Sequence, residues 1–217
     1  MNITALGDQA ILAQFPSETE ALAFAAAVRA ADWPEVIDVV PAYFSVAVYH
    51  DLDLVGQAEL APRLQSLKLN ASSPAAVGRR HVIPCCYDLG PDLAAVAERA
   101  KLSPSEVVAL HAGAEYTVYA IGFCPGFPYL GYLPEPLCGQ PRLPSPRLRV
   151  PPGSVGLTGR QTGIYPLERP GGWNLIGRTP LELVNVEDGY FPLRAGDRVR
   201  FQAIDAKLFE ELKGKRL

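Results

Sequence analysis

At the start of the chain, hydrophobic and polar positions form two strand-like patterns followed by a helical one. Asn2–Leu6 and Ala10–Phe15 are separated by a short turn that contains glycine, which predicts a β-hairpin. Ser17 and Glu20 have the spacing of a capping box at a helix start. Strong helix formers continue over Ala21–Ala31, so a helix is predicted from Ser17 onward.

Two more strand patterns and a second helix follow. Val36–Val40 and Phe44–Tyr49 contain the branched and aromatic residues that favour strands. The second of these alternates poorly, which suggests that it is buried on both faces. Leu54–Leu69 is predicted to be helical. This order predicts a small open sheet covered by helices, that is, an N-terminal α/β sandwich domain over residues 1–75.

A polar stretch and a change in charge indicate a second domain. Asn70–Gly78 contains small and turn-forming residues and is predicted to be an interdomain linker. Residues 1–75 carry nine acidic and three basic side chains, whereas residues 76–217 carry 14 acidic and 17 basic ones. The chain is therefore predicted to have two domains, residues 1–75 and residues 76–217.

The second domain begins with a strand pattern over Arg79–Tyr87 and two short helices, the second of which starts at Ser103. Helical patterns then disappear from Tyr116 almost to the C-terminus, and 12 of the 21 prolines lie between positions 125 and 180. Proline is excluded from helix interiors and central strands. Many short strands interrupted by glycine and proline predict a β-sandwich or barrel. The strand patterns cover Ser154–Thr158, Trp173–Gly177, Leu181–Asn185 and Arg198–Ala203.

Composition and charge narrow the function classes. A net charge of −3 and a pI near 5.7 argue against a nucleic-acid-binding domain. No apolar run reaches the length of a membrane span, and the first residues lack the features of a signal peptide. The four cysteines include an adjacent pair and no C-x-x-C motif, which is typical of free thiols in a reducing cytoplasm.

Arginine is concentrated in one part of the second domain. Between Gly139 and Arg178 there is no lysine, and the only acidic residue is Glu168. Planar guanidinium groups suit carboxylates and phosphates, so this stretch predicts an anion site. A solvated loop surface with scattered ion pairs fits the same composition. The arginines are Arg142, Arg147, Arg149, Arg160, Arg169 and Arg178.

One segment rich in glycine and proline precedes this arginine-rich region, and others lie within it. Ile121–Tyr132 carries two phenylalanines and two tyrosines, which either fill the barrel core or present rigid aromatic rings to a ligand or partner. In Val150–Gly156, the glycines around Ser154 do not fit a nucleophile elbow, so a loop that binds an oxyanion or phosphate is favoured. Gly156–Gly163 matches no nucleotide-binding glycine motif.

Histidine offers one candidate for acid–base chemistry. His111 lies four residues before Glu115 at a predicted helix end and is interpreted as a general acid or base, or as a polar positioning group. His81, Cys85 and Cys86 form the only other cluster of possible ligands, but adjacent strand residues point to opposite faces. No metal site is therefore predicted.

The segment Tyr116–Leu130 resembles the signature of the allophanate hydrolase subunit 1 family, which is also called the KipI / 5-oxoprolinase B-subunit (PxpB) family. Further motifs match in the same order, and together they span about half of the chain. From these motifs and the hairpin around Gly7-Asp8, the chain is identified as a member of this family. The motifs are Pro141-Arg142, Pro146-Arg147, Val150–Gly156, Gln161–Pro166, Pro170–Trp173, Leu175–Pro180 and Gly196–Phe201.

The resemblance implies an α+β fold with a small N-terminal α/β domain and a C-terminal cyclophilin-like β-barrel. It also implies one component of a prokaryotic 5-oxoprolinase, which converts 5-oxo-L-proline, ATP and water to L-glutamate, ADP and phosphate. The expected partners are the homologous C subunit and the A subunit of that enzyme. ATP is expected as a substrate held mainly by the partner, and the isolated chain is expected to be inactive.

Roles for individual residues follow from the resemblance and the patterns above. His111 is the expected proton carrier. The residues expected to bind the substrate or nucleotide are Arg142, Arg147, Ser154, Gln161, Tyr165 and Arg178. The residues expected to contact a partner are Phe123, Phe127, Tyr129 and Trp173.

Two other functions are compatible with the same residues. Related KipI proteins inhibit a sensor histidine kinase by binding it, and the aromatic side chains of Phe123–Tyr132 would then form the contact surface. A prolyl isomerase is a weaker alternative, because the sequence contains no separate catalytic signature for it.

Overall fold

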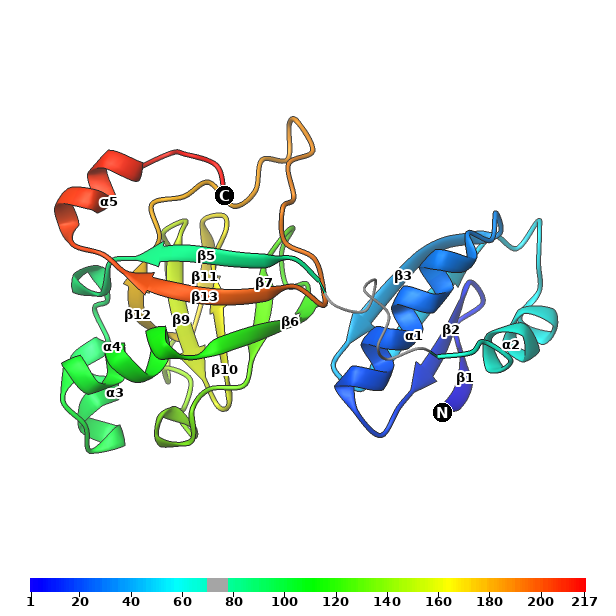
Figure 1. Ribbon diagram of the computed structural model, residues 1–217, viewed down its shortest axis with the longest axis horizontal. Helices are drawn as coiled ribbons and strands as arrows, with labels where there is room; N and C mark the ends of the chain where they lie inside the picture. The colour runs from blue at the N-terminus through cyan, green and yellow to red at the C-terminus, as the bar shows by residue number, and fades with distance from the viewer. Residues whose placement is uncertain (70–77) are drawn as a thin grey trace. The chain divides into compact units, whose positions relative to one another are not determined.

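The computed structural model describes residues 1–69 and 78–217, and the chain divides into two compact units, Met1–Gly78 and Arg79–Leu217 (Figure 1). Most of the predicted linker Asn70–Gly78 lies outside the described residues. The predicted boundary after residue 75 stays a prediction. Each unit has its own hydrophobic core, as expected when each buries a separate set of apolar side chains.

The first unit is a four-stranded antiparallel sheet with the strand order β1-β2-β4-β3. Phe24 and Val28 of α1 pack against Ile11, Val39 and Val48 on one face of this sheet. The predicted hairpin and first helix are present, and the Ser17 hydroxyl accepts a hydrogen bond from the Glu20 backbone N–H. The elements are β1 (Asn2–Leu6), β2 (Ala10–Gln14), α1 (Glu18–Ala31), β3 (Val36–Ala42), β4 (Ser45–His50) and α2 (Gln57–Gln65).

Two details of this unit differ from the sequence prediction. β4 buries Val46, Val48 and His50 while Tyr49 is exposed, so burial on both faces is wrong. Its buried side faces the helices, and the alternate side chains lie on the opposite face of the sheet. The second helix is shorter than Leu54–Leu69, because Ser66 ends it and donates its hydroxyl to the Arg63 carbonyl.

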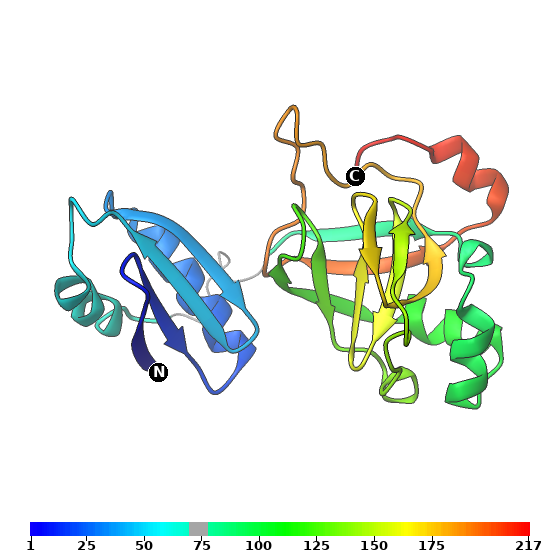
Figure 2. The same ribbon diagram turned by 180° about the vertical axis from the view of Figure 1, so that it is seen from behind.

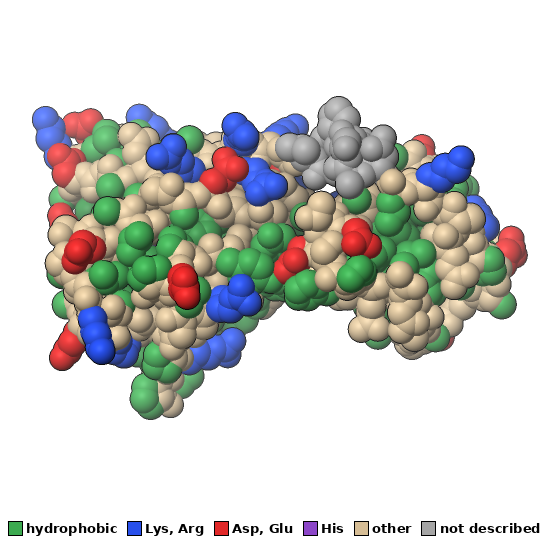
Figure 3. All heavy atoms as spheres, turned by 60° about the horizontal axis from the view of Figure 1, so that its bottom comes forward, with side chains coloured by type: hydrophobic (Ala, Val, Ile, Leu, Met, Phe, Trp, Pro, Cys, Tyr) green, Lys and Arg blue, Asp and Glu red, His purple; other side chains and the backbone are tan. Residues whose placement is uncertain are grey.

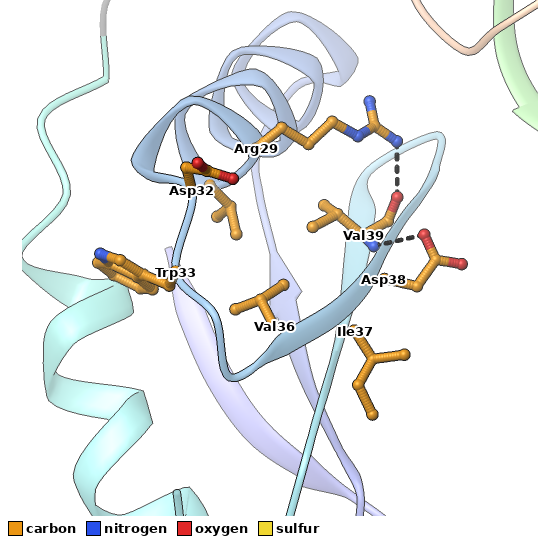
Figure 4. Close-up of a pocket in the computed structure, with 8 residues that line it drawn as sticks. Arg29, Asp32, Trp33, Val36, Ile37, Asp38 and Val39 are labelled. Carbon is orange, nitrogen blue, oxygen red and sulfur yellow. Dashed lines mark hydrogen bonds between the residues drawn. The ribbon is translucent and has the colours of Figure 1, made fainter. Parts of the chain in front are cut away.

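β3 is an edge strand whose free edge is covered by side chains (Figure 4). Arg29 Nη2 donates to the Val39 carbonyl at 2.6 Å, and the Val39 N–H donates to Asp38 Oδ1 at 2.7 Å. Pro41, two residues further on, has no N–H to offer. These side chains border a pocket of about 210 Å³ between the end of α1 and β3. The contacts occupy both backbone polar groups of Val39, which are therefore not available to another strand.

The second unit is a nearly closed barrel built from a seven-stranded sheet with the order β12-β9-β10-β7-β6-β13-β5. Two backbone hydrogen bonds between Cys86 and Arg178, of 2.8 and 3.0 Å, join the two ends of this order. In Figure 2, β8–β12 lie on the near side of the barrel, and β5 and β13 cross behind them. The mixed α+β fold with a C-terminal barrel is therefore confirmed.

The remaining elements connect and cover the strands of the barrel. Ser103 forms a complete capping box with Glu106 at the start of α4, as predicted. The elements are β5 (Arg80–Cys85), η2 (Tyr87–Leu89), α3 (Leu93–Ala100), α4 (Pro104–Gly113), β6 (Glu115–Ile121), β7 (Pro128–Gly131), η3 (Glu135–Leu137), β8 (Arg147–Val150), β9 (Ser154–Thr158), β10 (Gln161–Ile164), β11 (Arg169–Gly171), β12 (Asn174–Arg178), β13 (Arg198–Ala203) and α5 (Ala206–Leu212).

The predicted strand over Leu181–Asn185 is wrong. Among the residues that the structure describes, the segment forms only two isolated bridges, from Glu182 to Arg216 and from Asn185 to Tyr190. The segment therefore pairs with the C-terminal residues and a local turn instead of joining the barrel. Its apolar residues Leu183 and Val184 are nevertheless buried, which explains why they resemble a strand in the sequence.

Candidate functional site

Five aromatic side chains form a cluster on the outside of the barrel, and we call it the aromatic cluster. Neighbouring ring centroids are 5.0–6.1 Å apart. Adjacent strand residues point to opposite faces, so Leu130 and Ile164 enter the barrel core while their neighbours Tyr129 and Tyr165 point outward. The cluster consists of Phe123, Phe127, Tyr129, Tyr165 and Trp173.

Glycines in two central strands make room for the aromatic cluster. A Cβ atom at Gly163 would lie 3.0 Å from both Phe127 Cζ and Trp173 Cζ3. At Gly156 it would lie 3.1 Å from Trp173 Cβ. The rings of Phe127 and Trp173 therefore pack directly on the backbone of β10, and the Cβ atom of Trp173 packs on β9.

Phe123 presents its ring to solvent from a fixed loop. Its side chain is 58% exposed, and its backbone adopts the left-handed conformation, with φ of 66°, that non-glycine residues rarely adopt. The Gly122 N–H donates to the Phe127 carbonyl at 3.1 Å and closes the loop, and Gly126 packs tightly against Val184. Strained backbone of this kind is often found at functional sites.

Two cations lie beside the aromatic cluster. Burial raises the pKa of Tyr129 and Tyr165, and the positive charge of Arg142 offsets part of each rise. Arg169 has the same effect on the pKa of Cys124, which burial also raises. Among the described residues, no carboxylate lies within ion-pair distance of either arginine. Both are exposed, so both are available to an anionic ligand.

Arg147 is held by a carboxylate that the sequence analysis missed. Its Nη2 donates to Asp92 Oδ1 at 2.7 Å, and Asp92 Oδ2 accepts the Leu175 backbone N–H at 2.7 Å. Nη1 of Arg147 is buried and has no hydrogen-bond partner in the described part of the chain. Asp92 lies 55 residues before Arg147, so no local pattern indicates the pair.

The other three arginines of the arginine-rich region have separate contacts. Arg149 pairs with Glu168 at 3.5 Å on the exposed surface. The Arg160 guanidinium lies 4.4 Å from the centre of the Tyr132 ring. Arg178 donates from Nε to the Pro152 carbonyl at 2.8 Å. It borders a pocket of about 410 Å³ that also includes Phe209 and no residue of the aromatic cluster. The arginines therefore do not converge on one site.

Ser154 and Gln161 both take part in contacts within the barrel. Ser154 is 4% exposed, its hydroxyl donates to the Pro151 carbonyl at 2.7 Å, and its own carbonyl accepts the Tyr165 N–H. Gln161 begins β10, where it pairs with Thr158 and Gly131. The Ser154 hydroxyl proton is therefore already used in a hydrogen bond to the backbone.

His111 lies inside the barrel core, away from solvent. It is 0% exposed and hydrogen-bonded through Nδ1 to the Tyr87 hydroxyl (2.7 Å) and through Nε2 to Thr162 Oγ1 (2.9 Å). Burial lowers its pKa to about 3, so it is neutral at neutral pH. Of the two roles considered for it, the geometry favours the polar positioning group over the proton carrier.

We searched the described part of the chain for groups of metal-ligating side chains and for helices that could span a membrane. Within residues 1–69 and 78–217, no three histidine, cysteine or acidic side chains are grouped so that they could hold a metal ion. Over the same residues, no helix has the length and apolar character needed to cross a membrane. On the face drawn in Figure 3, acidic and basic side chains are interspersed among hydrophobic ones.

Comparison with known proteins finds relatives that all carry the same name. The sequence model of the carboxyltransferase domain, subdomain C and D, matches residues 1–190. The chain is 39% identical to the B subunit of 5-oxoprolinase from Bacillus subtilis (strain 168), over 97% of this chain and 96% of that protein. It is 44% identical to the B subunit of 5-oxoprolinase from Escherichia coli O157:H7, covering 81% of each chain.

Solved structures support the same architecture. The crystal structure of TTHA0988 matches 92% of this chain with a TM-score of 0.81 and 38% identity, but this chain spans only 40% of the length of that one. The urea carboxylase of Kluyveromyces lactis matches 97% of this chain and 22% of its own length, with a TM-score of 0.67. At 16% identity, the second likeness concerns the fold alone.

Proposed function

This chain belongs to the family of the carboxyltransferase domain, subdomain C and D, and on that premise we propose that it is the B subunit of a 5-oxoprolinase. The proposal rests on 37–44% identity with relatives of that name, over 81–97% of this chain. Neither these relatives nor the described residues favour the kinase inhibitor or the prolyl isomerase.

The proposed reaction converts 5-oxo-L-proline, ATP and water to L-glutamate, ADP and phosphate. A lactam carbonyl is a poor electrophile, so the γ-phosphoryl group is first transferred to the lactam oxygen and ADP leaves. Water then attacks the activated carbon, the ring C–N bond breaks and phosphate leaves. Catalysis of phosphoryl transfer depends mainly on positioning and on cations around the transferring group.

In this proposal, Arg142 binds an anionic group of the substrate, either the 5-oxoproline carboxylate or a phosphate. Arg142 is exposed beside Tyr129 and Tyr165, and no described carboxylate neutralises it. Arg169 is a second cation at the same cluster. Arg147, which Asp92 already binds, has a supporting role, and Arg178 lies at a different pocket.

The homologous C subunit, in this proposal, contacts the chain at Phe123 and provides most of the ATP contacts, and the A subunit completes the complex. Rigid aromatic side chains are frequent energetic centres of protein interfaces. Phe127 and Trp173 are 2% and 5% exposed, so they are too buried to contact a partner directly. The Phe127 ring packs against the Phe123 ring and supports it. The exposed Phe123 ring is therefore the proposed centre of the contact.

Steady-state kinetics of the reconstituted complex test this assignment. Loss of a charge-assisted hydrogen bond costs about 1.5–3 kcal/mol, so Arg142→Ala is expected to lower kcat/KM for 5-oxoproline by about 10–100-fold. Arg149→Ala removes an exposed arginine of the neighbouring hairpin and is expected to leave kcat/KM unchanged. Undiminished turnover of Arg142→Ala contradicts the residue assignment. A wild-type complex that releases no glutamate contradicts the function itself.

A further inference from the structure

We propose that α3 positions Arg142 by holding both ends of the loop that carries it, residues 140–147, through the side chains of Asp92 and Arg99. This inference rests on the proposed function for the role of Arg142. Asp92 precedes α3 and Arg99 lies in its last turn. Seven residues make about two helical turns, so the two side chains emerge on the same side of the helix.

Asp92 holds the C-terminal end of the loop. Its backbone N–H donates to the Leu175 carbonyl at 2.9 Å, and its Oδ2 accepts the Leu175 N–H at 2.7 Å. This reciprocal pair fixes Asp92 to β12. The other carboxylate oxygen, Oδ1, accepts from Arg147 Nη2 at 2.7 Å. The Asp92 side chain is 13% exposed, so solvent screens the ion pair less than it would at the surface.

Arg99 holds the N-terminal end of the loop. Its Nε donates to Gln140 Oε1 and its Nη2 donates to Asn174 Oδ1, each at 2.7 Å. Asn174 in turn donates from Nδ2 to the Pro141 carbonyl at 2.7 Å. Gln140 and Asn174 are 4% and 1% exposed. Their amides would be costly to leave unpaired, which makes these contacts specific.

Arg142 lies between residues that are fixed on both sides. The Leu143 N–H donates to the Gly172 carbonyl at 2.7 Å, directly after Arg142, and the Pro141 carbonyl is bound directly before it. Pro144 and Pro146 further restrict the backbone of the loop. The backbone on both sides of Arg142 is therefore held in place, and α3 acts on Arg142 through this backbone.

A loop whose backbone is already ordered loses less conformational entropy when its arginine binds a ligand. Asp92 and Arg99 are thus positioning residues that act through the loop, and their loss affects substrate affinity more than turnover. Asp92→Asn keeps the shape of the side chain but removes its charge. Arg99→Gln removes the fork that binds two acceptors, whereas Arg99→Lys keeps the charge but provides a single binding point.

Double-variant kinetics of the reconstituted complex separate positioning from general loss of structure. Asp92→Asn and Arg99→Gln are each expected to raise KM for 5-oxoproline by about 10-fold while kcat changes less than about twofold. In the Arg142→Ala background they are expected to have no further effect on KM, because the residue they position is absent. An unchanged KM, or the same rise in both backgrounds, overturns the proposal.

Hydrogen exchange provides a second readout that needs no activity. The Leu143 amide is expected to exchange about 10-fold faster in Asp92→Asn and Arg99→Gln, and also faster in Arg99→Lys, than in the wild-type chain. Arg149→Ala is the control and is expected to leave this amide unchanged. Equal exchange in all variants overturns the positioning role. If the wild-type complex releases no glutamate, the proposed function fails while the exchange result still decides whether α3 orders the loop.

Discussion

The contacts of His111 favour a structural role over the acid–base role that its position in the sequence suggested. The sequence places a histidine near a helix end, which is compatible with acid–base chemistry. In the structure its two ring nitrogens are both engaged inside the barrel, by Tyr87 and Thr162. Its ring also packs 4.6 Å from that of Phe201. These contacts join α4 to the strands of the barrel, which is a structural task.

The burial of His111 predicts a pH-dependent contribution to stability. Its pKa falls from the ordinary 6.5 to about 3 in the folded chain, so below pH 6.5 the unfolded chain binds a proton that the folded chain does not. The His111 contribution is complete above pH 6.5 and decreases as the pH falls toward 3. Urea denaturation at pH 7.5 and pH 5 is expected to show that the stability difference between wild type and His111→Gln shrinks by about 1–2 kcal/mol. A constant difference contradicts this account.

The backbone of Phe123 predicts that stability and partner binding respond differently to substitution. Phe123→Gly and Phe123→Ala both remove the exposed ring, but only glycine adopts a φ of 66° without steric cost. Phe123→Gly is therefore expected to be about 1 kcal/mol more stable than Phe123→Ala in urea denaturation. Both are expected to weaken capture of the C subunit in a surface binding assay. An alanine variant as stable as the glycine variant contradicts the strain, and full affinity contradicts the contact.

Among the secondary-structure elements, the edge strand β3 predicts a role for Arg29 in solubility. Arg29 covers the Val39 carbonyl, and Asp38 covers the Val39 N–H on the same edge (Figure 4). Arg29→Ala uncovers the carbonyl, so the chain is expected to lose about 1–2 kcal/mol of stability and to self-associate at high concentration. Light scattering and urea denaturation check both, with the exposed Lys68→Ala as a charge-matched control. A monomeric Arg29→Ala of wild-type stability contradicts the covering role.

Sequence patterns predict strands and helices where side chains repeat regularly, and they predict less where contacts are distant. β13 has the bounds Arg198–Ala203 that the alternation predicts, and α4 starts at its capping box. The strand pattern of Leu181–Asn185 fails because burial alone produced it. Asp92 and Arg99 could not be found in advance, because their partners Arg147 and Asn174 lie 55 and 75 residues away in the chain.

The site residues predicted from the sequence stay predictions. The concentration of arginines and aromatic residues does identify the part of the chain in which Arg142 and the aromatic cluster lie together. It does not indicate that Arg149, Arg160 and Arg178 have contacts of their own. The composition of the segment gives the number of arginines but not their positions in space. Those positions depend on the turns between the strands.

At the scale of the whole molecule, the residues assigned to function lie in the second unit, and the first unit folds around a separate core. The proposed function assigns one part of a binding site to this chain and the rest to its partners. It therefore predicts activity for the complete complex and none for the chain by itself.

The most direct test is the stoichiometry of products from the reconstituted complex. With 5-oxoproline and ATP, the complex of this chain with the A and C subunits is expected to release glutamate and ADP in equal amounts. Omission of this chain is expected to abolish glutamate release. Glutamate release at the same rate without this chain, or ATP hydrolysis by the full complex without glutamate, would contradict its assignment as the B subunit of a 5-oxoprolinase.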